Sequence, residues 1–154
     1  MSITLSQAIT QTRHYLKDTT ENVWTNVEII AFIDEAIGII KKTVPLWFTT
    51  LTRITNPTVT TAANLAQLIV IDVDYANLIS IFASARCFEQ DEQFYRGVQK
   101  MNEFEARKLE MEDDIYASDE YAALLAASTT VTDEHVEDVY SDTVAEDDSI
   151  IGYM

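Results

Sequence analysis

The chain has 154 residues, of which 47% are hydrophobic, but only three Gly and two Pro. A β-sandwich or barrel needs turn residues at intervals of roughly 8–12 positions, so this scarcity argues against both and favours one helical domain with an extension. The net charge of −16 argues against DNA recognition through a basic patch, because such a chain repels phosphate groups.

The charge is distributed unevenly along the chain. Residues 1–108 hold ten Lys and Arg against twelve Asp and Glu, a net charge of −2. Residues 109–154 hold fourteen acids and no Lys or Arg, a net charge of −14. The first composition is that of a balanced globular domain, whereas the second is typical of a solvated or partner-seeking tail.

A first helix is predicted from about Leu5 to Lys17. Thr4 and Gln7 have the spacing of a capping box, in which two side chains satisfy the free N–H groups at a helix start. Apolar or small side chains recur on one face of this segment, at Leu5, Ala8, Ile9, Thr12 and Leu16.

A second and longer helix is predicted from about Asn26 to Thr43. Thr25 or Asn26 can cap it, and Glu28 lies in the first turn, where a carboxylate meets the positive end of the helix dipole. Pro45 then prevents its continuation. The periodic apolar residues between these ends predict a helix with a wide buried face.

Residues 46–72 are rich in Thr and β-branched side chains, which favour strands, and Asn56-Pro57 marks a turn. We therefore predict a small β-hairpin or wing in this region, with residues 48–55 paired to residues 67–72. A lone hairpin is only marginally stable, so it should pack on the helices or on a neighbouring chain.

Two more helices are predicted, from about Tyr75 to Glu89 and from about Asp91 to Tyr116. Asp72 and Asp74 are both candidates for the N-cap of the first of these helices. The fold class is thus mainly α: a four-helix bundle-like core with a small β-hairpin, followed by an extended C-terminal arm.

The helical pattern weakens after residue 116, which divides the chain into a core, 1–116, and an acidic arm, 117–154. Residues 121–126 can form a short amphipathic turn or two, but residues 128–154 show no sustained period and cannot bury enough surface to offset chain entropy. Scattered apolar side chains among the acids are predicted to contact a partner; these are Tyr121, Leu124, Leu125, Val136, Val139, Tyr140, Ile150, Ile151 and Tyr153.

The sequence offers no pattern for catalysis, a cofactor or a metal ion. Cys87 lies in an apolar run and is predicted to be a buried packing thiol. His14 and His135 are far from it, which leaves no zinc pattern, and the acids of residues 110–114 lack the alternation and turn Gly of a calcium loop. We expect a protein that is not an enzyme.

No membrane association is expected either. The first residues lack the basic start and apolar core of a signal peptide, and no apolar run approaches the ~18 residues that a membrane span requires.

Residues 13–18 read R-H-Y-L-K-D, residues 24–29 read W-T-N-V-E-I, and residues 34–36 read D-E-A. These segments resemble the opening of the head-to-tail connector (adaptor) proteins of tailed bacteriophages. That family typically begins with R-x-x-L-x-D, a loop, W-[ST]-[DN]-x-E-[LI], and an N/D-E-A inside the second helix. The corresponding residues here are 13–18, 24–29 and 34–36, and the positions that carry the pattern are Arg13, Asp18, Trp24, Glu28 and Asp34. The resemblance extends over about residues 3–116.

The resemblance implies a structural virion protein in the neck, at the head–tail interface, made in the host cytoplasm. Its implied partners are the portal protein, neighbouring copies of itself in a ring that is usually a dodecamer, and tail or tail-completion proteins. DNA would pass through the channel without sequence recognition. A tail-completion or stopper protein of the neck is the nearest alternative, and an acidic regulatory binding module is a second one.

Overall fold

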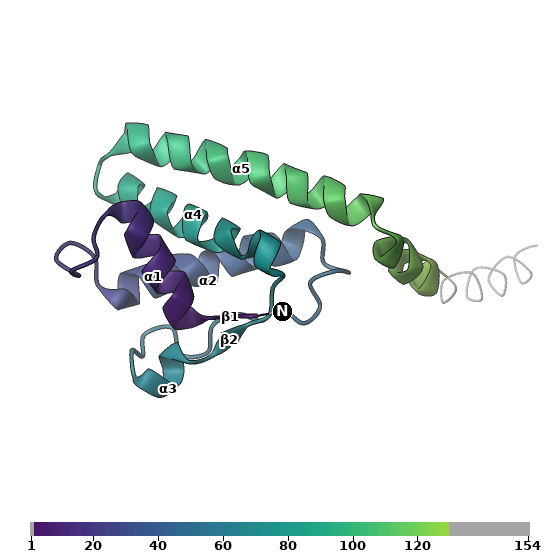
Figure 1. Ribbon diagram of the computed structural model, residues 1–154, viewed down its shortest axis with the longest axis horizontal. Helices are drawn as coiled ribbons and strands as arrows, with labels where there is room; N and C mark the ends of the chain where they lie inside the picture. Colours follow the sequence, from purple (N-terminus) through teal and green to yellow (C-terminus); the bar gives the residue numbers. More distant parts are fainter. Residues whose placement is uncertain (1, 130–154) are drawn as a thin grey trace, which may run out of the picture. The chain divides into compact units, whose positions relative to one another are not determined.

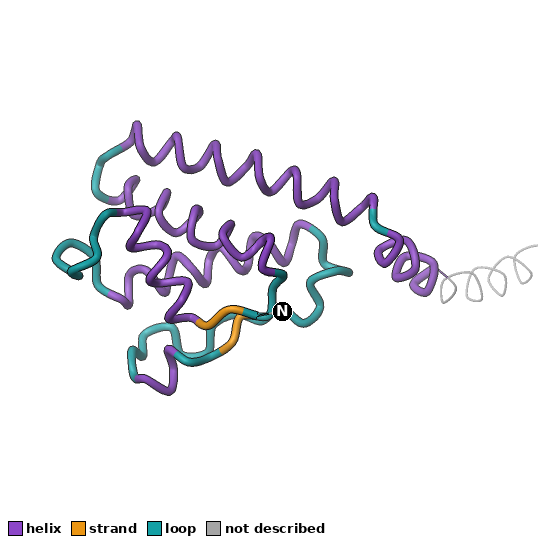
Figure 2. The backbone as a smooth tube through the Cα atoms, viewed as in Figure 1, coloured by secondary structure: helices purple, strands orange, loops and turns teal. Residues whose placement is uncertain are grey.

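The computed structural model describes residues 2–129. Its elements, in chain order, are β1 (Ile3–Thr4), α1 (Leu5–Leu16), α2 (Asn26–Thr43), α3 (Ala62–Leu65), β2 (Leu68–Ile69), α4 (Val73–Gln90) and α5 (Phe94–Ala117). The prediction of a mainly helical chain with a small antiparallel sheet is confirmed. Figure 1 shows the elements, and Figure 2 shows how little of the chain is strand.

Capping boxes begin the first two helices. The Thr4 hydroxyl accepts from the Gln7 N–H at 3.1 Å, and the Gln7 side chain accepts from the Thr4 N–H at 2.8 Å. Thr25 and Glu28 repeat this arrangement at α2, so the cap predicted at Thr25 or Asn26 is Thr25. Because both boxes are local in sequence, the predicted starts of these helices are correct.

α4 is the central helix of the core. Every residue from Leu78 to Ala85 is buried, whatever face of the helix it occupies, which is the pattern of a helix enclosed by neighbours. α1 and α2 both pack against it, and the buried side chains of α2 include Ile33, Ile37 and Ile40.

α5 runs alongside α4, as Figure 1 shows. It contributes Phe104, Met111 and Ile115 to the core, and the Phe104 ring meets the Phe82 ring edge-on with 5.1 Å between centroids. The buried Gly97 brings the start of α5 close to α4. α5 begins at Phe94 rather than at the predicted Asp91, because residues 91–93 form the turn between the two helices.

The predicted hairpin of residues 48–55 with 67–72 is wrong. β2 exists, but it pairs antiparallel with β1 at the start of the chain, with Ile3 opposite Ile69 and Thr4 opposite Leu68. Residues 48–55 form no strand.

Side chains and local turns, not a strand ladder, bond the backbone of residues 48–59. The Ile54 N–H donates to the Asp34 carboxylate at 2.8 Å, and the Thr55 N–H donates to the Gln67 side chain at 3.0 Å. Asn64 donates to the carbonyl groups of Asn56 and Val59. Leu51, in this loop, is fully buried, so the segment packs on the helices as a loop.

The described chain divides into two compact units, the first comprising residues 1–115 and the second beginning at Tyr116. In the second unit residues 119–129 are helical, which is longer than the turn or two predicted for 121–126. The Ser118 hydroxyl accepts from the Tyr121 N–H at this helix start. The Tyr121 ring packs edge-on against the Tyr116 ring.

Candidate interaction surfaces

A buried guanidinium joins the end of α1 to the start of α2. Arg13 is 5% exposed, and its Nη1 lies 3.1 Å from the Asp18 carboxylate. Its Nη2 donates to the Trp24 carbonyl at 2.8 Å and to the Asn26 side chain at 2.7 Å. We call these four residues the Arg13 junction. An Arg suits it because the planar fork donates in several fixed directions at once.

Asp18 fixes the loop between the two helices. Its carboxylate accepts from the N–H groups of Asn22 and Trp24 at 3.0 Å each. Burial alone raises the pKa of the Asp18 carboxyl, but these backbone donors, that of Val23 and the Arg13 guanidinium together leave this pKa lowered. The Arg13 junction therefore pairs one cation, Arg13, with one carboxylate, Asp18, and connects α1 to α2 through them.

Asp34 lies apart from the Arg13 junction and holds the loop after α2. Arg53 donates to both Asp34 oxygens, at 2.9 Å and 2.6 Å. Burial acts to raise the pKa of Asp34, but the hydrogen bonds from Arg53 and the Ile54 N–H leave it lowered. Of the five pattern residues, then, Arg13, Asp18 and Trp24 meet in one place, Glu28 caps α2, and Asp34 serves a second, separate contact.

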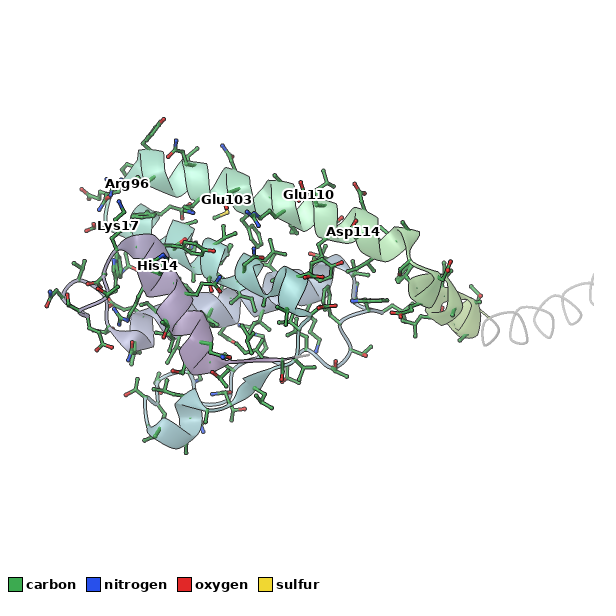
Figure 3. The ribbon with its side chains drawn as sticks, viewed as in Figure 1. His14, Lys17, Arg96, Glu103, Glu110 and Asp114 are labelled. Carbon is green, nitrogen blue, oxygen red and sulfur yellow. The ribbon has the colours of Figure 1, made fainter. Side chains whose placement is uncertain are left out.

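A groove lies between the end of α1 and the first turns of α5. It has a volume of about 460 Å³ and is lined by Tyr15, Leu16, Lys17, Phe88, Arg96, Gln99, Lys100 and Glu103. Three cations and one carboxylate line it, so we call it the basic groove. Figure 3 shows Lys17 and Arg96 at the same end of the first unit, with Glu103 further along α5.

The cations of the basic groove differ in how they are paired. Lys100 lies 2.9 Å from Glu103 and 4.5 Å from the centroid of the Tyr15 ring. Glu103 is also 3.4 Å from Arg107, so its charge is shared between two cations. Within the described residues, no ion pair joins Lys17 or Arg96 to a carboxylate. The groove thus has positive charge in excess.

A second surface is the apolar side of α5. Phe94 is 64% exposed and Val98 is 56% exposed, and Leu109 lies on the same side of the helix at about 100° of rotation per residue, as does the exposed acid Glu105. Large exposed apolar side chains that share one helix face mark an interaction site more often than isolated ones do.

The residues predicted to contact a partner fall into two groups. Leu124 and Leu125 are exposed on the helix of residues 119–129, and Tyr121 is half-buried against Tyr116. The other six lie outside the described residues: Val136, Val139, Tyr140, Ile150, Ile151 and Tyr153.

Cys87 and His14, the candidate residues for chemistry in the described part of the chain, differ in burial. Cys87 is buried, and desolvation followed by the charge of Glu28 raises the pKa of its thiol to about 12. His14 is exposed on α1. Among residues 2–129, no cluster of three His, Cys, Asp or Glu could hold a metal ion, and no helix is long and apolar enough to span a membrane.

Sequence reasoning missed the basic groove and Arg53. The groove combines residues 15–17 with residues 88–103, and Arg53 is 19 positions from Asp34. The sequence carried only a weak sign of the groove. All ten Lys and Arg lie in residues 1–108, but their positions along the chain do not say which of them share a surface.

Comparisons with family models, curated proteins and solved structures gave no match.

Proposed function

We propose that this chain is a head-to-tail adaptor: a structural virion protein that forms a ring below the portal, extends the DNA channel and provides the surface to which the tail attaches. The observation that supports this most is the Arg13 junction. Arg13, Asp18 and Trp24 are motif residues of the resemblance, and here they bind one another across the α1–α2 loop.

One exposed surface and one feature of the composition suit a protein that works in an assembly. The apolar side of α5 exposes Phe94 and Val98, which a neighbouring copy would cover. Residues 109–154 carry fourteen acids without a cation. A channel wall with few cations does not hold phosphate groups, so DNA can slide along it.

The partners in this proposal are the portal protein, further copies of this chain and the tail or its completion proteins. The direct test is cryo-electron microscopy of the virion that contains this chain. We expect density for a ring of copies in the neck, between the portal and the tail. Density for this chain anywhere other than the neck would reject the proposal.

The C-terminal residues are expected to attach the ring to the portal. Deletion of residues 128–154 should leave the first unit folded, because all the buried core residues described lie between Leu5 and Ile115. It should lower the amount of this chain that sediments with portal-containing heads. A deletion variant that co-sediments as well as the full chain would show that the arm does not attach it.

A further inference from the structure

A stripe of charged residues follows one side of α5. In chain order it consists of Arg96, Lys100, Glu103, Arg107, Glu110 and Asp114, and Figure 3 labels Arg96, Glu103, Glu110 and Asp114 along the helix. At about 100° of rotation and 1.5 Å of rise per residue, these positions fall within about 80° of one another and span about 27 Å. We call them the charged stripe. The exposed Phe94 and Val98 lie on a different side of α5.

The charges of the stripe are antisymmetric about position 105. Positions 96 and 114 are equally far from it, as are positions 100 and 110, and positions 103 and 107. Each of these three couples consists of one cation and one acid. If a second copy of α5 runs antiparallel along the stripe, with the two positions 105 opposite each other, every charge faces one of opposite sign. A parallel copy would instead place like charges opposite each other.

A second groove lies at the far end of the stripe from the basic groove, between the first turns of α4 and the last turns of α5. It has a volume of about 250 Å³ and is lined by Asp74, Tyr75, Asn77, Leu78, Arg107, Glu110, Met111 and Asp114. Its lining contains three acids and one cation, so we call it the acidic groove. The basic groove contains three cations and one acid. The two ends of one surface are therefore complementary in charge.

The charges at the two ends of the stripe are available to a partner. Arg96, Glu110 and Asp114 are exposed, and within residues 2–129 no ion pair joins any of them to an opposite charge. In the middle of the stripe, Glu103 is already paired with Lys100 and Arg107. The end charges should therefore contribute most of the attraction and set the orientation of the partner.

We propose that two copies of this chain pair antiparallel through the charged stripe, with the basic groove of each facing the acidic groove of the other. Such a contact uses the same surface on both copies and closes at two, whereas neighbours in a larger ring meet through two different surfaces. The pair is thus a form of the chain outside the ring, and the inference does not rest on the proposed function. Because its contacts are largely polar, the pair forms reversibly.

Sedimentation velocity of the full chain over a range of concentrations measures this pairing. We expect a reversible equilibrium between monomer and dimer, with no larger species. A chain that stays monomeric over the whole range would overturn the proposal. Growth beyond the dimer would also overturn it, because open-ended growth requires contact between two different surfaces.

Charge reversal at the two ends of the stripe tests the surface and the orientation. Arg96→Glu and Asp114→Arg each create two like-charge contacts in a symmetric pair, so each variant should raise the dissociation constant of the dimer at least about tenfold. An equal mixture of the two variants should restore pairing. In the mixed pair, the acid introduced in one copy faces the arginine introduced in the other, and the native Arg96 and Asp114 face each other at the second contact. Both substitutions in one chain should restore pairing as well.

Lys42→Glu and Asp113→Arg are the matched controls. They make the same two changes of charge at exposed positions outside the stripe, and Asp113 is the direct neighbour of Asp114. We expect both to leave the dissociation constant within about twofold of the native value. A mixture of Arg96→Glu and Asp114→Arg that does not dimerise would overturn the assignment, as would equal weakening by the controls. These measurements use the free chain, so a failure here is distinct from a failure of the neck assignment.

Discussion

At the scale of single residues, the difference between the two Arg–Asp pairs is one of burial. Arg13 and Asp18 have side chains that are each 6% exposed, whereas Arg53 is 59% exposed in its pair with Asp34. Removing one partner of a buried pair leaves an uncompensated charge away from water, while an exposed charge is solvated again.

Arg13→Met should therefore lower the free energy of unfolding by about 3–5 kcal/mol, because Asp18 stays buried without its cation. Arg53→Met should cost about 1 kcal/mol or less, because Arg53 is exposed to water and Asp34 keeps the hydrogen bond from the Ile54 N–H. Urea denaturation followed by circular dichroism measures both values. Equal losses for the two variants would contradict the assignment of the Arg13 junction as the contact that holds α1 to α2.

Acid should weaken the same junction. The pKa of Asp18 is lowered from an ordinary value of 3.8, so its contribution to stability is complete above that value and is lost as pH falls through the lower, folded-state pKa. Glu28, with a pKa lowered from 4.5 by the Thr25 N–H and hydroxyl, acts in the same direction. We expect unfolding free energy to fall steadily below about pH 4.5, and the advantage of the native chain over Asp18→Asn to shrink over that range.

Cys87 should be unreactive in the folded protein. Its thiol is buried and its pKa is about 12, so almost no nucleophilic thiolate is present near neutral pH. Iodoacetamide at pH 8 should leave the folded chain unmodified and add one group after denaturation in guanidinium, as read by mass spectrometry. Rapid labelling of the folded chain would show that the core around Cys87 opens readily.

At the scale of elements, two helical glycines have opposite surroundings. A Cβ on Gly97 would lie 3.0 Å from Glu89 Cγ, 3.3 Å from the Glu89 backbone nitrogen and 3.4 Å from the Ala85 carbonyl, so α4 and α5 would have to move apart. A Cβ on Gly38 would meet the end of the Arg53 side chain, 2.7 Å away, which can swing out into water.

Gly97→Ala should therefore be destabilising by about 1–3 kcal/mol, because overpacking outweighs the better helix propensity of Ala. Gly38→Ala loses only the exposed Arg53 contact and gains about 1 kcal/mol of helix propensity, so it should be neutral or slightly stabilising. Thermal unfolding of the two variants gives the comparison. A more stable Gly97→Ala protein would show that the contact between α4 and α5 is loose.

The helices were predictable because their signals are local. Thr4 with Gln7 and Thr25 with Glu28 are three residues apart, and the apolar stripes recur within single helices. The hairpin predicted in the Thr-rich segment was wrong for two reasons. The backbone of this segment bonds to the distant side chains of Asp34 and Gln67, and β2 pairs with the start of the chain. The basic groove forms where residues of α1, α4 and α5 come together, so no pattern within one helix could predict it.

At the scale of the whole molecule, stability and acidity belong to different parts of the chain. The described core side chains all come from the first unit, and fourteen acids lie in residues 109–154. Deletion of residues 128–154 should thus change the unfolding free energy of the first unit by less than about 0.5 kcal/mol. Calorimetry of both chains measures this, and a large loss would show that the deleted residues support the core.

The loop between α1 and α2 has one more consequence, in the rate at which its backbone exchanges hydrogen with solvent. Loop amides usually exchange quickly because they are open to water. The N–H groups of Asn22 and Trp24 donate to the Asp18 carboxylate, which is itself held by Arg13. These amides should exchange with deuterium as slowly as those of a helix, and Asp18→Asn should release them while the interior of α4 stays protected.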